Sequence, residues 1–334
     1  MRILSRVLSK IVSVLVERKP TWLNSLFTKA VVEYGFVPNV ISNRKYTTKW
    51  EDLGFHISQN HFYHPIPDMR AISEEYWSKG LSINGLVFDY AVQKNILSEI
   101  VEKYAIDYNQ FPQAQSDNLK PWEYFVQNGN FTSVDGEVAY SFVRKFKPKR
   151  IIEIGSGYST FVLSRSIEDE RKTNPDYFCH FTAIEPFPRD FFRTSIPSLS
   201  ELIEKPVQSI GVDFFKSLQK DDILFIDSSH VCKYGSDVEF ELFDILPNLN
   251  VGVIVHFHDI FWPKPYPKEW VVEKGWFWNE QYFLQAFLSF NDSFEILWCG
   301  SLMHNNYPTL LQSGFPRYDP EKVNPGSLWI RRIK

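Results

Sequence analysis

Cysteine is scarce in this sequence, and long hydrophobic runs are missing. The 334 residues include only three cysteines, Cys179, Cys232 and Cys299, and no short spacing pairs them. Neither a disulfide framework nor a cysteine zinc site is indicated, and a reducing cytosol fits. No segment reaches the roughly 18 to 20 uninterrupted apolar residues of a membrane-spanning helix. The sequence therefore predicts a cytoplasmic protein.

A strong excess of charge is also missing. Lysine and arginine number 36 and aspartate and glutamate 40, so the net charge is −4 and no nucleic-acid partner is expected. The 15 glycines and 20 prolines form no low-complexity pattern, and no internal repeat is visible, which argues against disorder and repeat architectures. Aromatic residues, by contrast, are abundant, with 29 Phe, 16 Tyr and 10 Trp. Most should fill a core, and those near prolines and histidines suit pockets, lids or subunit contacts.

Residues 1–19 predict an amphipathic helix with apolar side chains on one face and Arg2, Arg6 and Lys10 toward another. Because Arg6 and Lys10 interrupt the apolar stretch, the segment is not read as a signal peptide. Two interpretations remain open. The helix docks onto the protein or a sister subunit of a homo-oligomer, or it lies on an anionic membrane surface, which would place the protein at the inner face of the membrane.

The rest of the chain divides into two regions with different patterns. Residues 20–140 predict a mainly helical lid or dimerisation region, with an amphipathic helix at 91–104. Residues 141–334 predict an α/β domain, because short apolar runs alternate with helical segments such as 160–167. Strands are predicted at 150–154, 181–184, 223–226 and 251–257, and an antiparallel edge pair at 294–299 and 327–331.

A glycine-rich turn follows the first predicted strand, in Glu153-Ile-Gly-Ser-Gly-Tyr158. Gly155 and Gly157 allow a tight bend and close approach to a ligand, and the helix that follows offers N–H groups to it. An ordinary strand-to-helix turn is the alternative. A dinucleotide fingerprint would have a third glycine where this chain has Thr160, so an NAD-type pyrophosphate site is disfavoured.

The second predicted strand ends in Ile184-Glu185-Pro186. A carboxylate at that position can accept hydrogen bonds from both hydroxyls of a ribose. A ribose without a pyrophosphate indicates an adenosine-type ligand. The alternative is that Glu185 is a plain surface carboxylate.

Two further clusters, Asp227-Ser-Ser-His230 and His256-Phe-His258-Asp259, follow the remaining strands. Their side chains should converge at the carboxyl edge of the sheet, where two carboxylates can share a divalent cation and an imidazole can act as a general base. Asp227 could instead cap a turn. His256 alternates away from His258 and is expected to be a buried, hydrogen-bonded strand histidine.

Together, these motifs resemble the class I S-adenosylmethionine-dependent methyltransferases. The closest group contains metal-dependent O-methyltransferases of macrolide sugars, and the resemblance covers about residues 130 to 334. It implies a Rossmann-like, mostly parallel sheet with helices on both faces. It also implies that the cofactor is bound by Glu153, Gly155, Ser156, Gly157, Glu185 and Asp227. Asp227, Asp259 and His258 would hold Mg²⁺ or another divalent cation.

The resemblance further implies that His230 and Asp227 are catalytic. His230 would be the general base, since an ordinary histidine pKa near 6.5 leaves the neutral imidazole available. We expect O-methylation of a small-molecule or glycan acceptor, because a base and a cation both activate a hydroxyl. The aromatic segment 261–270, with Trp276, Phe277 and Trp278, could roof the acceptor pocket. Two alternatives stay open: a non-catalytic glycan-assembly partner with the same fold, and a metal hydrolase that uses His256, His258 and Asp259.

Overall fold

The computed structural model describes residues 48, 51–52, 54, 56, 58, 60–193 and 196–334. The helix predicted for residues 1–19 lies outside the described residues. The chain separates into two compact units, Met1–Ile72 and Ser73–Lys334. In the described part of the first unit, a short 3₁₀ helix, η2, spans Met69–Ala71. The sheet and every candidate site residue belong to the second unit, and domain boundaries at residues 19 and 140 stay predictions.

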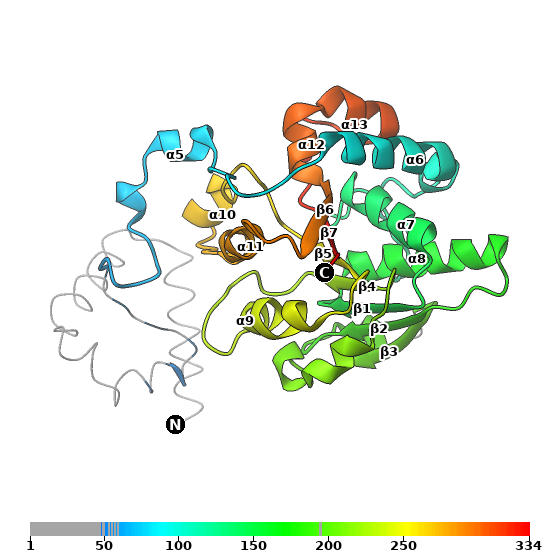
Figure 1. The fold of residues 1–334 in the computed structure, drawn as a ribbon, viewed down its shortest axis with the longest axis horizontal. Helices are drawn as coiled ribbons and strands as arrows, with labels where there is room; N and C mark the ends of the chain where they lie inside the picture. The colour runs from blue at the N-terminus through cyan, green and yellow to red at the C-terminus, as the bar shows by residue number, and fades with distance from the viewer. Residues whose placement is uncertain are drawn as a thin grey trace. The chain divides into compact units, whose positions relative to one another are not determined.

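The second unit is built on a sheet, in which the structure describes seven strands (Figure 1). Their order is β3-β2-β1-β4-β5-β7-β6, with β1 to β5 parallel and β7 antiparallel to both of its neighbours. The strands are β1 (Arg150–Ile154), β2 (His180–Ile184), β3 (Leu199–Ile203), β4 (Ile223–Ile226), β5 (Ile254–Phe257), β6 (Phe294–Cys299) and β7 (Leu328–Arg332). This confirms the predicted Rossmann-like methyltransferase sheet and its antiparallel edge pair.

Two strands differ from the sequence prediction by more than one residue. β3 (Leu199–Ile203) was not predicted, because it is an edge strand of mixed polarity with none of its residues fully buried. The run predicted at 251–257 becomes a strand only at Ile254. Gly252 has φ +93°, which places the residues before Ile254 in a turn.

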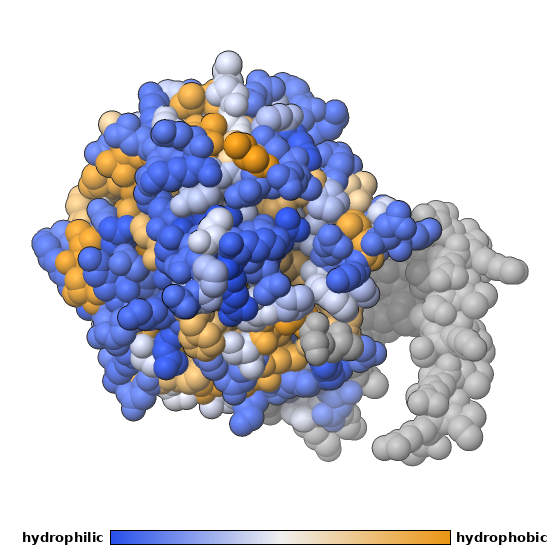
Figure 2. All heavy atoms as spheres, turned by 90° about the vertical axis from the view of Figure 1, so that its right-hand side faces the viewer, coloured by the Kyte–Doolittle hydropathy of each residue, from blue (hydrophilic) through white to orange (hydrophobic). Residues whose placement is uncertain are grey.

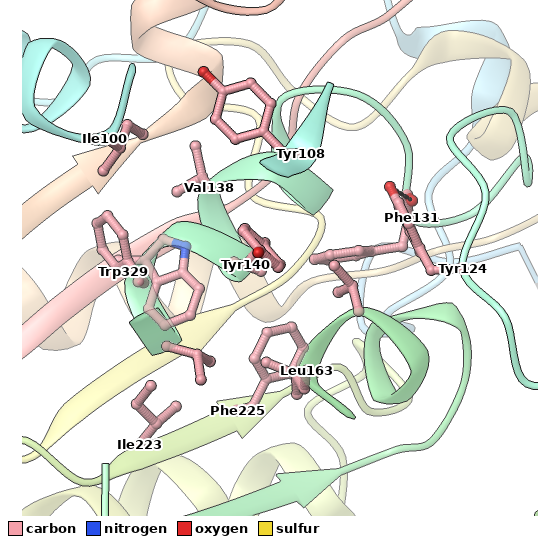
Figure 3. Packing of buried hydrophobic residues seen from close by; sticks show 14 of the residues in the cluster. Ile100, Tyr108, Tyr124, Phe131, Val138, Tyr140, Leu163, Ile223, Phe225 and Trp329 are labelled. Carbon is pink, nitrogen blue, oxygen red and sulfur yellow. Dashed lines mark hydrogen bonds between the residues drawn. The ribbon is translucent and has the colours of Figure 1, made fainter. Parts of the chain in front are cut away.

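Helices cover both faces of the sheet, as predicted. On one side lie α6 (Tyr90–Tyr108), α7 (Asp135–Phe146) and α8 (Tyr158–Thr173), whose apolar side chains pack with Phe225 and Trp329 (Figure 3). On the other side, η5 (Val212–Ser217), α9 (Asp237–Phe240) and α11 (Glu280–Leu288) cover Leu224 and Val255. Because successive strand residues point to opposite faces, strands covered on both sides are apolar at almost every position.

The other helical segments surround this framework. The α-helices are α5 (Glu74–Lys79), α10 (Lys268–Val272), α12 (Gly300–Asn306) and α13 (Pro308–Gly314). The 3₁₀ helices are η3 (Asp190–Arg193), η4 (Val207–Ser209) and η7 (Leu246–Asn248), and η6 (Glu241–Ile245) is a short π-helix. The surface seen in Figure 2 is mainly hydrophilic, with smaller hydrophobic areas between the polar side chains. Among the described helices, none combines the length and hydrophobicity that crossing a bilayer requires.

Candidate functional site

The predicted site residues meet at the carboxyl edge of the sheet. β2, β1, β4 and β5 are consecutive neighbours, so the segments that follow them lie side by side. Backbone hydrogen bonds continue past the strand ends: the Asp227 N–H donates to the Ile154 carbonyl at 2.9 Å, and the His258 N–H donates to the Ile226 carbonyl at 3.0 Å. The turns after the strands are therefore held in register with one another.

The turn after β1 passes very close to the end of β4. Gly155 has φ +85°, and a Cβ at this position would lie 1.9 Å from the backbone oxygen of Asp227. Any side chain would collide with the neighbouring strand, so both the conformation and the contact require glycine. The first glycine of the motif is thus explained by packing between β1 and β4 as well as by approach to a ligand.

Glu153 supports this turn from inside the protein. Its side chain is fully buried, and its two oxygens accept hydrogen bonds from Ser159 Oγ and Thr160 Oγ1, both at 2.7 Å. Thr160 Oγ1 also accepts from the Gly157 N–H at 3.1 Å. Burial raises the pKa of Glu153 to about 8, although both hydroxyl hydrogen bonds oppose the rise. Glu153 therefore braces the glycine turn through residues of α8.

Glu185 lies beside the same turn. Its Oε2 is 3.2 Å from the Ser156 N–H, and its Oε1 accepts from the Phe187 N–H at 2.8 Å. Together with Gly155 and Asp227, Glu185 lines a cavity of about 450 Å³. Phe187 also lines this cavity and is 87% exposed. The carboxylate and an exposed aromatic residue thus share one pocket, and no sequence motif pointed to Phe187.

A second cavity, of about 480 Å³, lies against the ends of β1, β4 and β5. Asp227, directly after β4, lines both cavities. The other predicted residues in the second cavity are Ser156, Gly157, His230, His258 and Asp259. Three tryptophans, Trp270, Trp276 and Trp278, also line it, whereas Phe261 of the same aromatic segment is buried in the core.

The His230 side chain is held by carboxylates on two sides. Its Nδ1 lies 2.8 Å from Glu280 Oε2, while its Nε2 lies 3.4 Å from Asp227 Oδ1 and 3.6 Å from Asp259 Oδ2. Burial opposes the charged imidazolium, but hydrogen bonds to Asp227 and Glu280 and the charge of Asp259 outweigh it and raise the pKa of His230 well above its ordinary value. The ordinary pKa near 6.5 expected for His230 is therefore wrong.

Glu280 is a site residue to which no sequence motif pointed. It is the first residue of α11 and is almost completely buried. The N–H groups of Asn279 and Glu280 donate to the His230 carbonyl at 3.0 and 3.1 Å. The Asn279 side chain also accepts from the Cys232 N–H at 2.6 Å and donates to the Cys232 carbonyl at 3.2 Å. The start of α11 therefore holds the loop that carries His230.

His256 is buried in β5, as expected, but the hydrogen bond expected for its ring is not found. The ring stacks on Phe225 with 3.8 Å between ring centres, and its centre lies 4.6 Å from that of Trp329. Neither ring nitrogen has a hydrogen-bond partner among the described residues. Burial lowers the pKa of His256 well below its usual value, so the imidazole packs as a neutral aromatic ring.

The three proposed metal ligands do not gather around one point. His258 Nε2 lies 3.7 Å from Asp259 Oδ1, and the His230 imidazole takes up the space between Asp227 and Asp259. Within the described ranges, no group of three or more His, Cys, Asp or Glu residues is arranged to hold a metal ion. The residues present do not fit a metal centre, and the same finding leaves the hydrolase alternative without a ligand set.

A family model of known proteins matches the part of the chain that carries the candidate site. Residues 152–260 match the family model of a methyltransferase domain. The matched range runs from β1 through the end of β5 and contains the glycine turn, Glu185, Asp227, His230 and the pair His258 and Asp259. The methyltransferase-domain match supports methyl transfer as the activity of this chain.

Two individual proteins are also similar to this chain. An uncharacterized protein of Archaeoglobus fulgidus is 29% identical over 178 residues, which cover 52% of this chain and 78% of that protein. A solved structure from Plasmodium falciparum, a putative protein-L-isoaspartate O-methyltransferase in complex with S-adenosyl-L-homocysteine, is 12% identical with a TM-score of 0.27. That match covers 50% of this chain and 83% of the Plasmodium chain.

Proposed function

We propose that the protein is an S-adenosylmethionine-dependent methyltransferase that methylates a hydroxyl oxygen of a sugar or glycan precursor. The observation that carries the proposal is the 3.2 Å contact between Glu185 Oε2 and the Ser156 N–H, which joins the acid after β2 to the glycine turn after β1. Two separate sequence motifs thereby form one binding surface. An acidic residue after one strand beside a glycine turn after the next is the arrangement that binds a ribose at the edge of a parallel sheet.

The two cavities that Asp227 lines would bind different parts of the cofactor. The adenosine part of the cofactor would occupy the cavity of Glu185 and Phe187, with the ribose hydroxyls donating to the carboxylate and the exposed ring stacking on the base. The methionine part would pass Ser156 and Gly157 into the second cavity. Glu153, which is fully buried and lines neither cavity, would position the turn without touching the cofactor.

The second cavity would take the acceptor. The bound cofactor supplies a methyl group on a positively charged sulfur, and transfer requires an oxygen held in line with it. Because Nδ1 of His230 is occupied by Glu280, Nε2 is the ring nitrogen turned toward Asp227 and Asp259 at the cavity. Nε2 would take the hydroxyl proton, and the tryptophans would lie against the acceptor ring. Since the pKa of His230 is raised, the neutral ring that accepts this proton becomes more abundant as pH rises.

Calorimetric titration of the full-length protein with S-adenosylmethionine tests the proposal. Glu185→Ala should weaken binding by about 10²-fold or more, since two hydrogen bonds to a charged acceptor are each worth about 1.5 to 3 kcal/mol. Glu201→Ala, which removes an exposed carboxylate on neighbouring β3, is the matched control and should bind normally. Absence of binding by the unmodified protein, or equal binding by Glu185→Ala, would refute the assignment.

A further inference from the structure

Cationic side chains line the acceptor cavity as well as carboxylates. Arg189 and Lys274 line it, and they are the only arginine or lysine among the described residues that do so. The carboxylates of the cavity, Asp227 and Asp259, both lie beside His230 at the ends of the strands. The cavity is therefore asymmetric, with carboxylates and imidazoles at the sheet and two cations contributed by the segments that follow β2 and α10.

Arg189 has no anionic partner in the described part of the chain. Its guanidinium makes no hydrogen bond or ion pair there, although Arg193, four residues further on, pairs with Glu204 at 2.8 Å and Asp190 at 2.9 Å. The two arginines belong to the same short segment, and among the described residues only the one that lines the cavity has no such partner. A planar guanidinium in this state can bind the oxygens of a phosphate or carboxylate through two parallel hydrogen bonds.

The Lys274 ammonium group lies against the aromatic rings of the cavity. Its Nζ lies 4.9 Å from the centre of the Trp276 ring, and Trp276 stacks on Trp278 with 5.0 Å between ring centres. Its ion pair is with Glu269 at 3.1 Å, and both side chains are substantially exposed. Because exposed pairs of this kind contribute little, an anionic ligand can replace Glu269 at low cost. Lys274 can thus reach an anionic group on a molecule whose ring packs on these tryptophans.

We propose that the acceptor is an anionic sugar, one that bears a phosphate or carboxylate group bound by Arg189 and Lys274 while its ring lies against Trp276 and Trp278. This inference rests on the proposed function and narrows its substrate class. A cationic acceptor would be repelled by the two side chains. A neutral sugar would form no ion pair with either side chain.

Binding of three matched probes tests the charge requirement. The full-length protein, saturated with S-adenosylhomocysteine to prevent turnover, is titrated calorimetrically with glucose 1-phosphate, glucuronate and methyl glucoside. We expect at least one of the two charged probes to bind at least 10-fold more tightly than the neutral one, and the preferred one identifies the anionic group. Raising the salt concentration should reduce the difference, because exposed charges are screened.

Substitutions show which cations are responsible for the preference for charged probes. Arg189→Ala and Lys274→Ala should each reduce the preference several-fold, whereas Arg193→Ala and Lys268→Ala should preserve it. The two controls remove paired cations from the same two segments, outside the residues that line the cavity. Equal binding of charged and neutral probes, or a preference that survives both cavity substitutions, would overturn the proposal.

The cofactor titration separates this proposal from a rival role for Arg189. If Arg189 held the carboxylate of S-adenosylmethionine, Arg189→Ala would weaken cofactor binding and leave the probe preference unchanged, and the inference would fail. Unchanged cofactor affinity together with a lost preference supports it. Failure of the proposed function is distinct, since the unmodified protein would then bind neither S-adenosylmethionine nor S-adenosylhomocysteine.

Discussion

His230 Nδ1 lies 2.8 Å from Glu280 Oε2, and both side chains are buried although the residues are 50 positions apart. The same short helix start also binds the His230 backbone carbonyl through two N–H groups. A ring held at Nδ1 and at its own backbone has one orientation, and Nε2 is then turned toward Asp227 and Asp259. Glu280 is therefore a positioning residue for the proposed base.

Glu280→Gln should lower the rate of methyl transfer about 10-fold or more, because an amide neither fixes the ring as firmly nor stabilises positive charge on it. The KM of the acceptor and the affinity for S-adenosylmethionine should stay near normal, since Glu280 lines neither cavity. Steady-state kinetics and cofactor titration measure both effects. Glu273→Gln, at an exposed position shortly before α11, is the control. An unchanged kcat would remove the positioning role.

His230→Ala should reduce single-turnover methyl transfer by about 10²-fold or more while the cofactor still binds. The proposed base lines the acceptor cavity and is absent from the cavity that contains Glu185. His258→Ala is the informative comparison, because His258 lines the same cavity next to Asp259. Near-normal transfer by His230→Ala, with loss of transfer in His258→Ala, would move the role of base to His258.

Gly155→Ala should destabilise the protein by about 3 kcal/mol or more, since it adds a left-handed alanine and a collision with the next strand. The added Cβ would lie 1.9 Å from the Asp227 oxygen. Gly275→Ala separates the two effects: Gly275 has φ +67° with no atom within 4 Å of an added Cβ, and its cost should be about 1 kcal/mol. Urea unfolding measures both, and equal costs would contradict the packing argument.

The buried carboxyl of Glu153 predicts a stability that falls as pH rises. Its folded pKa of about 8 lies above the ordinary 4.5, so the folded state holds the proton more tightly and its advantage is lost between those values. The loss amounts to roughly 3 to 5 kcal/mol. Glu153→Gln has no proton to lose, so its unfolding free energy relative to the unmodified protein should improve from pH 5 to pH 9. A constant difference across that range would contradict the raised pKa.

Excess EDTA should leave methyl transfer unchanged, and added Mg²⁺ should not increase it. The reason is geometric: the His230 imidazole lies between Asp227 and Asp259, and no three-residue ligand group occurs among the described residues. Turnover is measured after extensive chelation and again after metal is restored. Loss of activity in chelator, with recovery on adding a divalent cation, would support Asp227, His258 and Asp259 as ligands after all.

The sequence predicted most of the sheet because buried strands have a local signature. The runs at Arg150–Ile154, Ile223–Ile226 and Phe294–Cys299 are strands with the predicted bounds. β3 was missed because none of its residues is fully buried, whereas β6, at the opposite edge, is buried at every position but one. The turn glycines and Glu185 were also readable, since each directly follows a strand whose end must face the same edge as its neighbours.

The contacts within the site were decided by the tertiary structure. The order of the strands brings Asp227 against Gly155, and the return of the chain at α11 brings Glu280 to His230. His256 packs between Phe225 and Trp329, so its ring is buried without the hydrogen bond that a strand histidine was expected to make. Periodicity and turn residues are local properties, so they can be recognised from short stretches of sequence. Which distant side chains share a cavity, and how each shifts the pKa of the next, depends on packing between segments far apart in the chain.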